Sequence, residues 1–119
     1  MTGPFGASTA SGHSWQDEEE VRWAVRAWAA RMNVRITQIH LRSMTRKWAS
    51  MSRGGRITLN TDLLTLPKEL GEFVIVHELA HLLVPNHGKV FKSFLTAYLP
   101  DWESRQAALQ QVPRGHQMA

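Results

Sequence analysis

The stretch FVIVHELAHLLV, residues 73–84, decides the fold of this 119-residue chain. Its apolar side chains lie on nearly all sides of a helix, which is typical of a helix buried in the middle of a domain. We predict one long helix over residues 67–84, with Pro67 near its first turn. Pro85 would end this helix, because the residue before a proline avoids the helical region.

This helix carries the pattern His-Glu-x-x-His at His77, Glu78 and His81. The two histidines are one helical turn apart on one face, so both imidazoles can reach a single metal ion. Glu78 is rotated to the side of that face. It can therefore act as the catalytic base on a water at the metal, without being a ligand itself. A metal would also offset the cost of burying these polar groups, which is several kcal/mol when they lack partners.

A catalytic zinc site needs a third protein ligand and an open position for water. We predict that His87 is this ligand, since it stands just beyond the helix break, with five residues between it and His81. The helix expected to follow would hold it in place. The remaining candidates are weaker, and they are His13, His40 and His116, with Asp101 and Glu103 in reserve.

The composition narrows the chemistry of the metal site. The chain contains no cysteine, so thiolate ligands are excluded and any metal must be held by histidine and carboxylate. Imidazole-rich sites with one water suit zinc, and we therefore expect one Zn²⁺ per chain.

The length suits a single domain between two tails. We expect a flexible N-terminal tail at residues 1–13, the domain at residues 14–111 and a C-terminal tail at residues 112–119. No stretch approaches the roughly 18 apolar residues of a membrane span, and the first residues do not form a signal peptide. We expect a cytoplasmic monomer that does not associate with membranes.

Helices are expected on both sides of the metal helix. Ser14, followed by acidic residues at positions 17–20, marks the cap and first turn of a helix that extends to about Met32. Two further helices are expected after the metal helix, one over residues 88–99 and one over residues 101–111. Asp101 would cap the last of them.

The middle of the chain is expected to form strands. Residues 35–47 favour a strand, with a bend allowed, and residues 56–60 alternate as a short strand does. The turn signal at residues 52–55 predicts that the two strands form a hairpin, with Trp48 on its first arm.

The net charge of +4 is unevenly distributed. No acidic residue occurs between Val21 and Thr61, while nine cations do: Arg22, Arg26, Arg31, Arg35, Arg42, Arg46, Lys47, Arg53 and Arg56. They are either a solvated basic surface or a face near the active-site cleft that binds nucleic acid or a nucleotide weakly.

The sequence resembles the YgjP-like family of small metallopeptidase domains, which is related to SprT and WLM proteins and is of the M48 type. The matching segments lie in one register, and they are residues 45–50, 57–60, 74–82, 85–88, Phe91 and residues 98–102. The resemblance implies a gluzincin-like α+β zincin fold and His87 as the third zinc ligand. Met51 replaces a cysteine that the family often carries, and Lys92 replaces an aromatic residue.

We therefore predict a zinc-dependent hydrolase, in the first place a metallopeptidase that cleaves peptide bonds in peptide or protein substrates. One alternative is a zinc-dependent hydrolase of an anionic small molecule such as a nucleotide. Another is a nucleic-acid-associated accessory domain whose zinc is structural. The residue that stabilises the oxyanion stays open among Tyr98, Asn86, Arg46 and Lys47.

Overall fold

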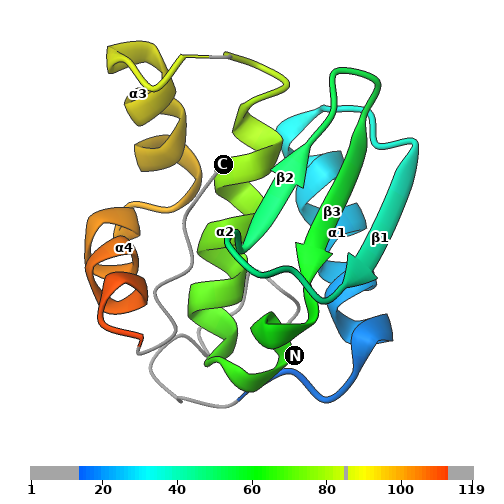
Figure 1. Ribbon diagram of the computed structural model, residues 1–119. Helices are drawn as coiled ribbons and strands as arrows, with labels where there is room; N and C mark the ends of the chain where they lie inside the picture. The colour runs from blue at the N-terminus through cyan, green and yellow to red at the C-terminus, as the bar shows by residue number, and fades with distance from the viewer. Residues whose placement is uncertain (1–13, 85, 113–119) are drawn as a thin grey trace, which may run out of the picture.

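The computed structural model describes residues 14–84 and 86–112, and these form an α+β domain (Figure 1). Three strands make one sheet in the order β1-β3-β2. No helix in these ranges has the length and apolar character needed to cross a bilayer. In chain order the elements are α1 (Glu18–Met32), β1 (Gln38–Arg42), β2 (Ala49–Met51), β3 (Arg56–Asn60), the 3₁₀ helix η2 (Thr61–Thr65), α2 (Lys68–Ala80), α3 (Lys89–Tyr98) and α4 (Trp102–Gln110).

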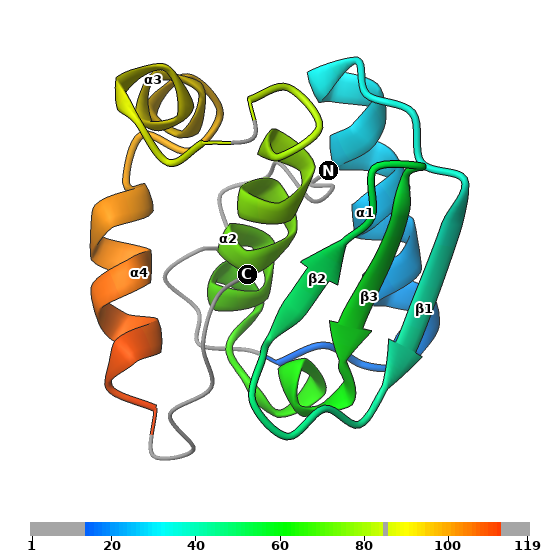
Figure 2. The ribbon, with the colours of Figure 1, turned by 45° about the horizontal axis from the view of Figure 1, so that its top comes forward.

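Helix α2 lies in the middle of the domain (Figure 2). The sheet and α1 lie on one side of it, and α3 and α4 lie on the other. Every residue from Leu70 to Ala80 is buried, which confirms the predicted buried helix. The helix ends at Ala80, four residues before the predicted end. The N–H groups of residues 81–83 donate to carbonyls three residues back, which tightens the last turn.

The N-cap of the first helix lies three residues after the predicted cap. Asp17, not Ser14, is the N-cap, and its Oδ1 accepts a hydrogen bond from the Glu20 N–H at 3.0 Å. The Ser14 backbone instead pairs with Pro67 in an isolated β-bridge. The N-terminal segment is thereby joined to the start of α2.

The sheet differs from the predicted hairpin. β3 pairs in antiparallel register with β2 and in parallel register with β1, so a hairpin between residues 35–47 and 56–60 is wrong. Trp48 comes just before the true first arm. The buried Asn60 side chain accounts for the difference, because its Nδ2 donates to the carbonyls of Met44 and Lys47, each at 2.8 Å. These bonds hold a bend between β1 and β2.

A buried ion pair connects the helices around α2. Glu72 on α2 is 6% exposed and Arg105 on α4 is 7% exposed, and the Arg105 Nη1 lies 3.1 Å from the Glu72 Oε1. Trp28 of α1 donates its Nε1–H to the Glu72 Oε2 at 3.2 Å. Burial raises the pKa of Glu72, while the hydrogen bonds from Arg105 and Trp28 lower it. One carboxylate therefore links three helices.

Replacing Arg105 should make stability depend on pH. In Arg105→Met the Glu72 carboxylate loses its buried cation, so its folded-state pKa rises further above the unfolded value. A raised carboxyl pKa means that stability is retained at low pH and lost as the pH rises through the folded-state value. We expect a loss of about 3–5 kcal/mol at pH 8 and a smaller loss at pH 5, measured by urea unfolding.

The double variant Glu72→Gln/Arg105→Met is the control. It leaves no buried charge, so it should be more stable at pH 8 than Arg105→Met and should lose the pH dependence. Equal destabilisation of Arg105→Met at pH 5 and pH 8 would contradict this account of the ion pair.

Candidate metal centre

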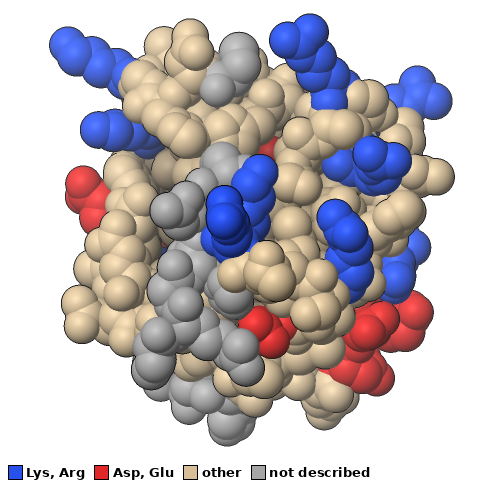
Figure 3. Space-filling model, viewed as in Figure 1, with Lys and Arg blue, Asp and Glu red and all other residues tan. Residues whose placement is uncertain are grey.

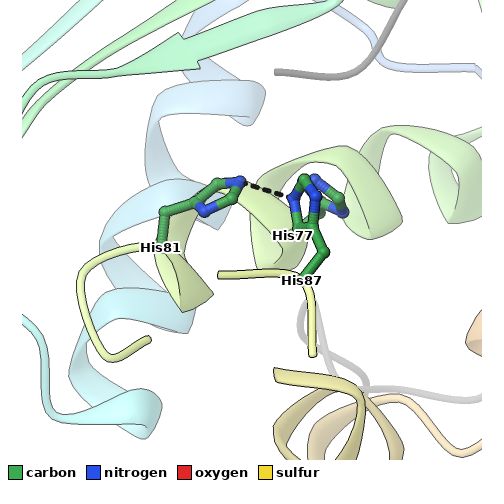
Figure 4. Close-up of side chains that lie close together, drawn as sticks. All are labelled: His77, His81 and His87. Atoms are coloured by element: carbon green, nitrogen blue, oxygen red, sulfur yellow. Dashed lines mark hydrogen bonds between the residues drawn. The ribbon is translucent and has the colours of Figure 1, made fainter. Parts of the chain in front are cut away.

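Three histidines from two segments of the chain come together at one end of α2 (Figure 4). His77 lies within α2, His81 caps its C-terminal end, and His87 precedes α3. Each offers a ring nitrogen, and these atoms all lie within 4.8 Å of one another. The Nε2 atoms of His81 and His87 are 3.1 Å apart. The three histidines singled out in the sequence therefore form one cluster.

The end of α2 explains how these side chains meet. His81 keeps a helical backbone conformation, with φ −64° and ψ −21°, so it stays one turn from His77. The Val84 N–H donates to the Ala80 carbonyl at 2.8 Å and closes the turn that ends the helix. The chain then enters α3, and His87 stands just before its first residues.

The cluster suits a zinc ion. Zinc–nitrogen bonds of about 2.0–2.1 Å place the nitrogens of a tetrahedral site about 3.3 Å apart, close to the separation of the His81 and His87 Nε2 atoms. Desolvation lowers the pKa of His87, and the neighbouring charge of His81 lowers it further. The neutral imidazole, which is the form that binds metal, is thereby favoured.

The other candidate ligands that lie within residues 14–84 and 86–112 do not join this cluster. His40 is exposed on β1, at the opposite edge of the sheet from β2. The Asp101 Oδ1 accepts a hydrogen bond from the Arg105 Nε–H of α4 at 2.9 Å, and Glu103 borders a neighbouring cavity. His13 and His116 lie outside the described residues.

Phe91 packs against all three histidines. Its ring centroid lies 5.2 Å from that of His77, 5.0 Å from His81 and 4.8 Å from His87, and the side chain is buried. The Phe73 ring centroid lies 5.7 Å from that of His77. Such an apolar shell orients ligands and limits the access of solvent. The sequence contained a partial signal for this role, because Phe91 lies in the apolar stripe of the helix that begins just after His87.

Glu78 borders a cavity on the β2 side of the cluster. This cavity has a volume of about 320 Å³, and Glu78 itself is fully buried. Glu78 is not one of the clustered donors. The residues that line the cavity are Lys47, Ser50, Met51, Ser52, Arg53, Glu78, His81 and Leu82.

A second cavity, of about 380 Å³, lies on the side of α3 and α4. It is lined by His77, His87, Phe91, Lys92, Leu95, Trp102, Glu103 and Gln106. The two cavities together border all three histidines, so a chain-like substrate could extend to both sides of the cluster.

The candidates for the oxyanion donor are not equally placed. Lys47 lines the same cavity as Glu78. Tyr98, Asn86 and Arg46 line neither of the two cavities. Lys47 is therefore the one of these four candidates that shares a cavity with Glu78.

The nine cations of the basic stretch lie on several elements. Arg22 on α1 donates to the Ile39 carbonyl at 2.7 Å, and Arg31 lies over the Trp28 ring, 5.2 Å from its centroid. In the view of Figure 3, Lys and Arg side chains lie at several separate places, over the sheet and also at the upper left beside α3, and they do not merge into one patch. Only Lys47 and Arg53 line the cavity beside Glu78.

The model of the YgjP-like metallopeptidase domain matches residues 14–112. The chain belongs to this family. It is also similar in structure to the metallopeptidase zymogen abylysin of Pyrococcus abyssi, with a TM-score of 0.71 at 20% identity over 81% of this chain and 97% of that one. It is likewise similar to the metallopeptidase zymogen of Methanocaldococcus jannaschii jannalysin, with a TM-score of 0.69 at 24% identity over 76% of this chain and 94% of that one. No curated protein matches the sequence.

Membership of the YgjP-like family confirms several predictions. The protein is a metallopeptidase whose cofactor is zinc, and peptides or proteins are its substrates. The structural likeness confirms the α+β fold of a small metallopeptidase. Neither comparison supports the nucleotide alternative.

The shell around the histidines yields a prediction. Phe91→Leu keeps an apolar side chain in the core but releases the three imidazoles, so zinc affinity should fall about 10- to 100-fold. Phe73→Leu is the matched control, and it should cost less because Phe91 packs at the centre of the three imidazoles, whereas Phe73 packs beside His77. Zinc competition with a chromophoric chelator measures both. An equal affinity of Phe91→Leu and the wild type would show that Phe91 is only a packing residue.

Proposed function

We propose that His77, His81 and His87 hold the zinc and that Glu78 is the catalytic base. The observation that carries this proposal is the convergence of three imidazole nitrogens within 4.8 Å beside a buried glutamate on the same helix. Three protein ligands leave a coordination position open, as catalytic zinc sites require. A structural zinc is usually closed by four protein ligands, and no fourth donor joins the cluster in the described residues.

Each residue has a distinct task in peptide hydrolysis. When bound, zinc supplies Lewis acidity, which polarises a carbonyl and makes water nucleophilic near neutral pH. The Glu78 carboxylate accepts a proton from the attacking water and then delivers this proton to the leaving amine. The buried position of Glu78 shields this proton transfer from bulk solvent.

The β2 strand favours an extended peptide as substrate. It is an edge strand of the sheet, and its residues Ser50 and Met51 line the cavity that contains Glu78. Edge strands bind peptides by strand addition, in which main-chain hydrogen bonds supply affinity without requiring one sequence. The peptide backbone would then lie next to the catalytic base.

The weaker expectations about partners stay predictions. One of them is that the nine cations bind nucleic acid weakly. The strength of such binding depends on how many of these cations one nucleic acid can contact at once. A monomeric state is the other.

Glu78→Gln should separate metal binding from chemistry. The amide is isosteric but cannot take a proton, so cleavage of casein should fall by about 10²- to 10⁴-fold while one zinc per chain is retained. Metal analysis and the rate of casein cleavage provide the two measurements. Turnover at the wild-type rate would remove Glu78 from the mechanism.

His87→Ala should lose zinc. Without the third imidazole the site has two protein ligands, and we expect the variant to be purified with much less than one zinc per chain. His40→Ala removes a histidine that is exposed on β1 and should keep a full zinc content. A full zinc load in His87→Ala would refute its assignment as a ligand.

A further inference from the structure

The cavity next to Glu78 has a cation near each end of β2. Lys47 precedes this strand by two positions and Arg53 follows it by two, and both line the cavity. Ser50 and Ser52 contribute hydroxyl groups between them. The strand thus presents an edge to an extended chain and a positive charge toward either end of that edge.

The two cations are available to a ligand within the described part of the chain. Neither Lys47 nor Arg53 forms an ion pair among residues 14–84 and 86–112, and both side chains are exposed. Among the described residues that line this cavity, Glu78 is the only acid. Positive side chains along a cleft raise the local concentration of negatively charged groups.

The cavity on the other side of the histidines has a different character. It contains one cation and one acid, Lys92 and Glu103, together with the apolar Leu95 and Trp102. Its charges therefore balance, whereas the β2 side carries two cations beside the catalytic glutamate. The two sides should select different side chains.

We propose that the β2-side cavity is a subsite for acidic side chains, so that the enzyme prefers peptides with Asp or Glu on that side of the cleaved bond. The inference rests on the proposed function, because it places the cleaved bond at the three histidines. Lys47 and Arg53 stand at opposite ends of β2, so each can meet a different side chain of a peptide lying along the strand. On the α3 and α4 side, uncharged side chains are accepted at least as well as acidic ones.

Casein digestion followed by mass spectrometry supplies the test peptides. A peptide around a cleaved bond is synthesised with Glu, Gln or Lys at each of three positions on either side of that bond. We expect kcat/KM to be about three- to tenfold higher for Glu than for Gln on one side only, at about 20 mM salt. This ratio should shrink at about 200 mM salt, where exposed charges are screened more strongly.

Charge-matched variants locate the subsite. In Lys47→Gln/Arg53→Gln the ratio of Glu to Gln peptides should fall to about one, and each single variant should lose part of it. Arg26→Gln/Arg42→Gln removes the same charge from exposed residues of α1 and β1 that line neither cavity, and it should keep the ratio. A ratio that persists in Lys47→Gln/Arg53→Gln, or no preference in the wild type, would overturn the proposal.

Binding to zinc-loaded Glu78→Gln separates this proposal from the proposed function. The variant should bind the Glu peptide more tightly than the Gln peptide, and the difference should vanish when Lys47→Gln/Arg53→Gln is added. If this pattern holds while the wild type cleaves no peptide, the subsite stands and the peptidase mechanism fails. If nucleoside triphosphates bind more tightly than the Glu peptide and the wild type hydrolyses them, the acidic-peptide subsite is refuted.

Discussion

The burial of α2 is the constraint on which the rest of the structure depends. An apolar helix can lie between a sheet and two other helices only if its few polar groups find partners there. His77 and Glu78 occur in the buried part of this helix, and Glu72 lies five residues before His77. The buried polar side chains find different partners, because Glu72 pairs with a cation and His77 clusters with two other imidazoles. The fold and the chemistry of this domain are therefore consequences of the same helix.

The cluster of three histidines lies at the end of α2 for a physical reason. A helix end is where the chain can turn and return, so residues six positions apart can face the same point. The early end of α2 at Ala80 leaves His81 still in helical conformation, and α3 then holds His87 and Phe91 together. The same arrangement opens the site to the cavity along β2 and to the cavity along α3 and α4.

Much of this site could be predicted from the sequence, because its signals are local. The i, i+4 spacing of His77 and His81 needs only a helix, and His87 needs only a turn after it. The pairing of the strands could not be predicted in this way. It depends on the Asn60 amide, which holds two distant carbonyls and bends the chain between β1 and β2. The two cavities could not be predicted from the sequence either, because only tertiary packing brings Lys47 and Arg53 to the cavity that Glu78 lines.

The most direct test of the central claim is X-ray absorption at the zinc edge, on the zinc-loaded protein and on the variant His87→Ala with zinc added back. The account predicts three imidazole nitrogens and one light atom from solvent at about 2.0–2.1 Å in the wild type. For any zinc that the variant still binds, it predicts two coordinating imidazole nitrogens instead of three. An unchanged number of imidazoles in the variant, or a carboxylate in place of the third histidine in the wild type, would contradict it.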